Sequence, residues 1–137
     1  MDQLSSLLPQ HQGYLPYFLI ANGLSAAIHS VVCYRGNPTA SLKAFSGPAA
    51  PPPHPLLART YGLKNFYTSF IRFYAAYHIT NPQLYDLAIL TFVGVLFLYI
   101  TEVFVYKTSN LREASLPYVI AGSSLMWMVS QRDWYLS

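Results

Sequence analysis

The stretch from Tyr14 to Tyr34 holds 21 residues and no Lys, Arg, Asp or Glu. A helix of that length is roughly 30 Å long, which matches the hydrocarbon core of a bilayer. A second apolar run, Leu87 to Tyr106, contains one acid, Glu102. Charged residues make up 9% of the whole chain, against about 25% in ordinary soluble domains. That is too few to cover a water-soluble surface, so the sequence predicts an integral membrane protein.

The hydrophobic runs predict one membrane domain over residues 1–137, an all-α bundle of about four transmembrane helices in an up-down arrangement. We place the spans at about 14–34, 56–79, 84–106 and 114–130. Pro82 suits the first turn of the third helix, whereas Pro117 is expected to open the fourth, which should end at the charged pair Arg132 and Asp133. A cleaved signal peptide is the alternative for the first run, although the segment before it has no Lys or Arg.

Residues 35–55 form a proline-rich segment between the first two runs. Because proline fixes φ and lacks a backbone donor, neither helix nor sheet is expected to persist there. We interpret residues 35–55 as a loop that acts as a stiff spacer, with a proline-type partner ligand as the alternative.

Whether the predicted span 56–79 crosses the membrane is ambiguous, because it carries Arg59, Lys64 and Arg72. Each charge near the bilayer centre costs about 2.5 to 3.5 kcal/mol on insertion scales. These cations therefore need partners or must snorkel to an interface; otherwise the run is not a span. Counting outward from the turn at residues 80–83, Glu102 lies about 27 Å along its helix, between Lys64 at about 22 Å and Arg59 at about 30 Å. Arg72 lies about 10 Å from the turn, where its long side chain can reach either the opposite interface or Asp86. We therefore predict an interhelical polar seam of Arg59, Lys64, Arg72, Asp86 and Glu102.

Two interpretations of this seam remain open. Buried ionisable groups in membranes often mark a proton or ion pathway. Glu102 and Arg59 fall near helix ends, however, which favours structural pairing close to the headgroups.

The first run contains small residues at helical spacing, Gly23 with Ala27 and Ala26 with Ser30. Such pairs let two helices approach closely, so they form a candidate face for helix packing or for a partner. Lys and Arg near the span ends favour cytosolic loops after the first and third spans, which would leave both termini lumenal.

The chain lacks the motifs of several enzyme and binding classes. It has no nucleotide-binding glycine loop, no HExxH, no GxSxG and no paired-carboxylate motif, and its four histidines are 18 or more residues apart. We therefore expect no cofactor, no metal ion and no catalytic residue. The net charge of +3 is dispersed, so no nucleic-acid partner is expected either.

The second and third runs contain several distinctive short blocks: Ala58-Arg59-Thr60-Tyr61-Gly62, Ile71-Arg72, Ala75-Ala76-Tyr77-His78-Ile79, Leu84-Tyr85, Thr91-Phe92 and Glu102-Val103-Phe104-Val105-Tyr106-Lys107-Thr108. In this order, the blocks resemble the ergosterol biosynthetic protein 28 family. The resemblance covers about half of the chain closely and the first and last runs more loosely.

This resemblance implies a small multi-pass protein of the endoplasmic reticulum membrane. It further implies a non-catalytic scaffold for sterol biosynthesis, with three enzyme partners: the sterol C-4 methyl oxidase, the sterol-4α-carboxylate 3-dehydrogenase and the 3-keto sterol reductase. A scaffold acts by raising effective concentration and needs no reactive site. The alternative is a small sterol-binding carrier or membrane enzyme that uses Glu102 with Arg59 or Lys64 as acid and base.

Overall fold

The computed structural model describes residues 2–137, apart from the side chain of Asp2, and this part of the chain is helical without strands. Four helices are long: α2 (Leu15–Arg35), α4 (Pro55–Tyr77), α5 (Pro82–Ile100) and α6 (Leu111–Leu136). Short elements are α1 (Asp2–Ser6), α3 (Pro38–Ser41), the 3-10 turn η1 (Lys43–Phe45) and the π-helical turn η2 (Thr101–Val105), which continues α5. The all-α prediction is therefore confirmed for the described residues.

Three of the long helices begin at a side-chain cap. Asn81 Oδ1 accepts a hydrogen bond from Leu84 N at 3.1 Å, and Asn110 Oδ1 accepts one from Arg112 N at 3.0 Å. At the start of α4, His54 Nδ1 accepts a hydrogen bond from Leu56 N at 3.0 Å. These bonds satisfy backbone donors that have no partner inside the helix. Pro82 follows the Asn81 cap in the first turn of α5, as the sequence predicts.

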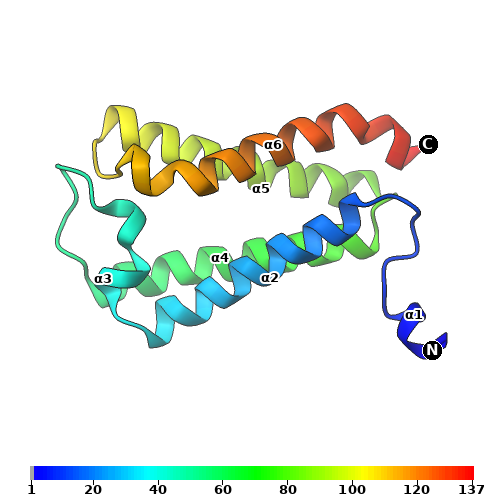
Figure 1. Cartoon of the computed structure of the whole chain (residues 1–137), viewed down its shortest axis with the longest axis horizontal. Helices are drawn as coiled ribbons and strands as arrows, with labels where there is room; N and C mark the ends of the chain where they lie inside the picture. Colours follow the sequence, from blue (N-terminus) through cyan, green and yellow to red (C-terminus); the bar gives the residue numbers. More distant parts are fainter. Residues whose placement is uncertain (1) are drawn as a thin grey trace.

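The four long helices run alternately up and down (Figure 1). Antiparallel α2 and α4 form one pair and antiparallel α5 and α6 form the other, and a short turn after Tyr77 joins α4 to α5. α3 and η1 lie at the opposite end of the bundle, beside the connection between η2 and α6. Ser109 Oγ donates to Ala44 O at 2.5 Å there, and Gly47 N donates to Thr108 O at 2.9 Å. The loops after α2 and after α5 therefore lie at the same end of the molecule.

Two sequence predictions need correction here. α6 begins at Leu111 and continues to Leu136, so Pro117 lies inside the helix and Arg132 does not end it. Pro117 removes one interior backbone donor, and the Asn110 cap has already started the helix nearly two turns earlier. The proline-rich segment 35–55 is not wholly irregular either, since the Asn37 side chain caps α3 by accepting from Thr39 N.

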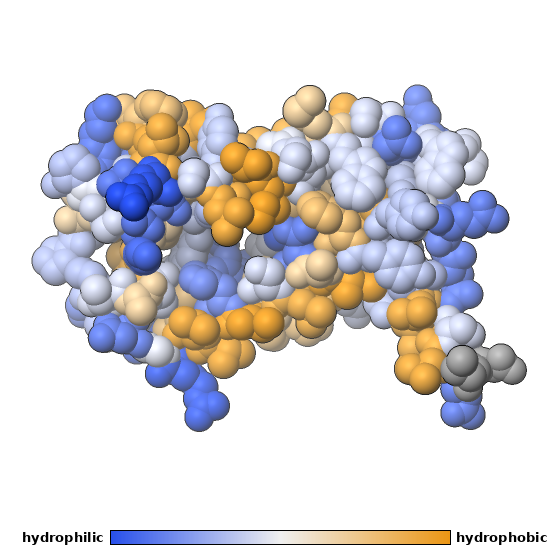
Figure 2. Space-filling view, in the orientation of Figure 1, coloured by the Kyte–Doolittle hydropathy of each residue, from blue (hydrophilic) through white to orange (hydrophobic). Residues whose placement is uncertain are grey.

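Much of the molecular surface is apolar (Figure 2). Phe97 is 69% exposed and Met126 is 74% exposed, although both lie within long helices. Among the described residues, α2 and the continuous stretch Pro82–Val105 are the two helices that are both long and apolar enough to cross a membrane. Apolar surface of this extent is unusual for a protein dissolved in water as a monomer.

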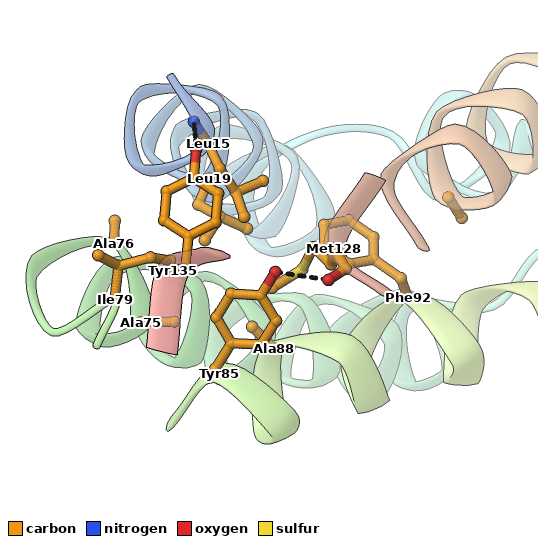
Figure 3. Packing of buried hydrophobic residues seen from close by; sticks show 11 residues of the cluster. Leu15, Leu19, Ala75, Ala76, Ile79, Tyr85, Ala88, Phe92, Met128 and Tyr135 are labelled. Atoms are coloured by element: carbon orange, nitrogen blue, oxygen red, sulfur yellow. Dashed lines mark hydrogen bonds between the residues drawn. The ribbon is translucent and has the colours of Figure 1, made fainter. Parts of the chain in front are cut away.

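The buried core lies at the end of the bundle where α4 turns into α5 (Figure 3). Tyr85 and Phe92 from α5 and Met128 and Tyr135 from α6 are at most 2% exposed. Two hydrogen bonds cross this core: Tyr85 Oη donates to Met128 O at 2.5 Å, and Leu15 N donates to Tyr135 Oη at 3.0 Å. The core thus joins α2, α4, α5 and α6 at one end of the bundle.

Candidate functional site

A cavity of about 350 Å³ lies between the two helix pairs, next to this core. All four long helices line it, and residues of α3 and η1 close the end opposite the core. This volume lies at the lower end of the range of small-molecule pockets, about 300 to 1,000 Å³. Its walls combine apolar side chains such as Val95 and Ile120 with an unusual set of polar groups.

Arg72 lies in the wall of the cavity and is 6% exposed. Its Nε donates to Thr91 Oγ1 at 3.1 Å, and its guanidinium carbon lies 4.1 Å from the centroid of the Phe92 ring. No described side-chain nitrogen is both fully buried and without a hydrogen bond. Since no hydrogen bond joins the two terminal nitrogens of Arg72 to a described residue, they reach the free space of the cavity.

Lys64 is the second cation that lines the cavity. It stands nine residues, or roughly 14 Å, from the start of α4, so it is close to the middle of the helix. Its Nζ lies 4.8 Å from the centroid of the Tyr61 ring, and no described carboxylate lies within ion-pair distance of it. A cation held in this way is stabilised by the ring but keeps its hydrogen-bond donors available.

Neutral polar pairs connect the helices around these cations. Asn65 Nδ2 lies 2.9 Å from His29 Nδ1 and links α4 to α2. The Tyr61 and Tyr99 hydroxyls lie 2.8 Å apart and link α4 to α5. These four neutral polar groups of the cavity wall therefore have partners, and their bonds help to fix the shape of the cavity.

The acids of the predicted seam lie elsewhere. Glu102 accepts a hydrogen bond from Thr108 Oγ1 in the connection after η2, and it pairs with neither Arg59 nor Lys64. Arg59 is exposed. The predicted seam is thus not formed as one cluster, because equal depth along two helices does not place side chains on facing sides. Arg59 and Lys64 are five positions apart, which turns them roughly 140° away from each other around the axis.

Asp86 has a different partner from the predicted Arg72. Its two carboxylate oxygens accept from Nε and Nη2 of Arg132 at 2.8 and 2.9 Å, which joins the start of α5 to the end of α6. We expect Asp86→Asn and Arg132→Gln to change the free energy of unfolding little, because the pair is solvent-accessible. Detergent titration of these two variants and of the double variant checks this, and a loss as large as that expected for truncating a buried core residue would contradict it.

The small-residue face of α2 lies against α4. A Cβ added to Gly23 would meet the Phe73 ring at 2.7 Å, and Ser30 Oγ donates to Gly62 O at 2.7 Å. Ala26 lines the cavity. Ala27, one turn from Gly23, is half-buried. Gly23 and Ser30 therefore serve the packing of α2 against α4 within the molecule and are not available to a partner.

Comparison with known proteins identifies the family of this chain. A family model described as "Erg28 like protein" matches residues 15–126. The chain belongs to the Erg28 family. It is 32% identical to Ergosterol biosynthetic protein 28 of Candida albicans over 139 aligned residues, which cover all of this chain and 99% of the relative. The protein of the same name from Saccharomyces cerevisiae is 28% identical, over 96% of this chain and 88% of the relative. No solved structure matches the chain.

The sequence prediction does not include three polar residues in or beside the Erg28-family cavity. Asn65 and Tyr99 line the cavity and bond across helices, and Thr91 accepts a hydrogen bond from Arg72. As isolated polar residues in apolar runs they carry no motif. One signal was available: Lys64 and Arg72 are basic residues in a span that has no acid. The sequence prediction does include both cations, but it pairs them with acids at matching depth instead of treating their charge as uncompensated within one helix.

Proposed function

We propose that this chain is a non-catalytic scaffold of the endoplasmic reticulum membrane that holds enzymes of sterol biosynthesis together. Its partners would be the sterol C-4 methyl oxidase, the sterol-4α-carboxylate 3-dehydrogenase and the 3-keto sterol reductase. Support comes from membership of a family whose named relatives are ergosterol biosynthetic proteins. A scaffold shortens the path of an intermediate between active sites by raising its effective concentration.

We further propose that α4 and α6 cross the bilayer beside α2 and α5, which gives four spans. α4 has 23 residues and α6 has 26, so each is long enough at 1.5 Å per residue. Lys64, near the middle of α4, and Arg72, five residues before its end, both line the interior cavity, so these two charges need not face lipid. The loops that contain Lys43 and Lys107 lie at one end of the bundle, which the positive-inside rule assigns to the cytosol.

The observation that carries the scaffold proposal is the outer face of α4. Large aromatic side chains follow one another along it, each at least 44% exposed: Phe66, Tyr67, Phe70, Tyr74 and Tyr77. Tyr67 is 61% exposed and lies roughly 18 Å from the start of the helix, near its midpoint. Its hydroxyl has no hydrogen-bond partner among the described residues.

A hydroxyl in that position is costly in lipid. Leaving a polar group without a partner in an apolar environment costs about 1 to 3 kcal/mol. A partner protein that packs on this face and supplies an acceptor would remove the cost, whereas hydrocarbon chains would not. The aromatic face of α4 therefore suits contact with another membrane protein better than contact with lipid.

The alternative, a sterol carrier or small enzyme that uses Glu102, receives less support. Acid–base chemistry requires the two groups within hydrogen-bond reach of one reacting atom. Glu102 does not line the cavity, and Thr108 occupies one of its oxygens.

Photocrosslinking in native membranes tests the scaffold directly. A photoreactive amino acid at Tyr67 is expected to capture at least one of the three sterol enzymes, identified by mass spectrometry. Leu90 on α5 has the same exposed fraction of 61% and is the matched control, expected to capture lipid. Tyr67→Phe should reduce co-purification of the enzymes roughly twofold to tenfold, because it removes one hydrogen bond. Identical crosslinks at both positions, or none to any of these enzymes, would refute the proposal.

A further inference from the structure

We propose that the cavity binds the anionic head, a carboxylate or phosphate, of a membrane amphiphile, with Lys64 and Arg72 as the cationic contacts. The inference uses the membrane-spanning part of the proposed function but not the scaffold role. A chain that failed to hold the sterol enzymes together could still bind such a molecule, and the reverse also holds.

The first argument is the charge of the cavity. Lys43, Lys64 and Arg72 line it, and no described acid does. Lys43 lies 3.6 Å from Glu113, so that charge has a partner outside the cavity. The other described acids are also placed elsewhere: Asp86 binds Arg132, Glu102 binds Thr108, and Asp133 is exposed. The positive charge of Lys64 and Arg72 is therefore uncompensated by the described residues.

The second argument is that these cations have donors to offer. Arg72 uses Nε for Thr91 and its guanidinium plane for Phe92, which holds the group in place and leaves the terminal nitrogens free toward the cavity. Lys64 contacts the Tyr61 ring and donates to no described acceptor. Charged donors fixed in position with no acceptor are the arrangement that binds an oxyanion.

The third argument concerns the route of entry. α2 and α6 lie on the same face of the molecule and leave a hollow between them, with hydrophilic side chains visible inside it (Figure 2). The side chains that these two helices contribute to the cavity wall include small and apolar ones, such as Ala26, Leu116 and Ile120. In a bilayer such an opening faces lipid rather than water. The cavity would then admit a molecule from the side, its charged head inside and its apolar body between the helices.

The size of the cavity agrees with this binding mode. About 350 Å³ holds a headgroup with the first part of its body but not an entire lipid. The neutral polar groups Asn22, Ser25 and His29 on the α2 wall can bond to further oxygens of the head. Asn22 and His29 already bond to Phe18 O and Asn65, so a fully apolar ligand would leave chiefly the donors of Lys64 and Arg72 without acceptors.

Binding to the purified, delipidated chain in an uncharged detergent tests the proposal. Native mass spectrometry would compare four probes: cholesteryl hemisuccinate, dioleoyl phosphatidate, cholesterol and inorganic phosphate. We expect one molecule of an anionic amphiphile per chain, bound more tightly than cholesterol or phosphate. Preference for the hemisuccinate would indicate a carboxylated ligand and preference for phosphatidate a phospholipid. Equal binding of cholesterol, or equal binding of free phosphate, would overturn the proposal.

Substitutions locate the site. Lys64→Met and Arg72→Met should each weaken binding roughly tenfold or more, because each removes a charge-assisted contact. Arg112→Gln removes an exposed cation outside the cavity and should leave affinity unchanged. Unchanged affinity in both cavity variants would overturn the assignment. If a methionine variant does not fold, Lys64→Arg should retain binding, and added salt should weaken binding to the unaltered chain.

Discussion

Replacing Gly62 with leucine is expected to force α2 and α4 apart and to lower the free energy of unfolding by about 3 kcal/mol. A Cβ at position 62 would lie 2.7 Å from Cys33 Cβ and 3.2 Å from Ser30 O. Both are close to the α2 backbone and cannot rotate away, so the helix itself would have to move. The hydrogen bond from Ser30 Oγ to Gly62 O would be strained by the same movement. Titration with sodium dodecyl sulfate, followed by circular dichroism, measures the loss.

Gly94→Leu is the matched control for this prediction. A Cβ at Gly94 would meet nothing within 4 Å, so the same substitution adds no clash. Glycine is about 1 kcal/mol less favourable than alanine inside a helix, and leucine is close to alanine, so this variant should be as stable as the original or slightly more stable. Equal losses at positions 62 and 94 would mean that the close approach of α2 to α4 is not what Gly62 provides.

Tyr135→Ala is expected to lower the free energy of unfolding by about 3 to 5 kcal/mol, the usual cost of truncating a buried aromatic residue. Tyr135 is 2% exposed, and its hydroxyl accepts the hydrogen bond from Leu15 N. Tyr14, in the cap position of α2, makes no side-chain bond to the helix, so Tyr135 takes over the role of a cap from 120 residues away. The substitution would open a cavity and also leave a backbone donor unpaired. The same titration measures this loss.

Two further variants separate these contributions. Tyr135→Phe keeps the ring and loses the hydrogen bond, so it should cost about 1 to 3 kcal/mol. Tyr14→Ala removes a tyrosine that is 80% exposed and should have little effect. A Tyr135→Phe variant as unstable as Tyr135→Ala would assign the whole effect to the hydrogen bond and contradict the packing argument.

The bundle has a tightly packed end, which holds the apolar core, and a more open part, which holds the cavity. Tyr85, Phe92 and Tyr135 hold all four long helices together at the end with the short turn. Beyond Phe92, the two helix pairs separate around Lys64 and Arg72. Hydrogen bonds such as Ser109 Oγ to Ala44 O still join the two pairs at the α3–η1 end, so opening requires least energy at the side of the cavity between α2 and α6, where few apolar contacts are broken. A ligand head could thus enter without disturbing the core.

Helix positions could be predicted from the sequence because their signals are local. Asn81 followed by Pro82 marks the start of α5, and α2 lies within one residue of the predicted span 14–34. Pro117 was misjudged because a proline rule considers one residue, whereas the Asn110 cap and the packing of α6 outweigh one missing donor. The polar contacts were misjudged for another reason. Depth along a helix follows from counting residues, but the direction of a side chain around its axis depends on which neighbour it meets.

The sequence by itself determined that this chain is helical, that it belongs to an apolar environment and that it resembles the Erg28 family. These properties follow from composition, hydrophobic run length and short residue blocks. All of these can be read from the sequence without knowing which distant residues meet. Only the tertiary structure decided that Asp86 meets Arg132, that Tyr135 caps α2, and that Lys64 and Arg72 share a cavity without a described acid. Each of these contacts joins helices distant in sequence, and their relative rotation results from the packing of all four together.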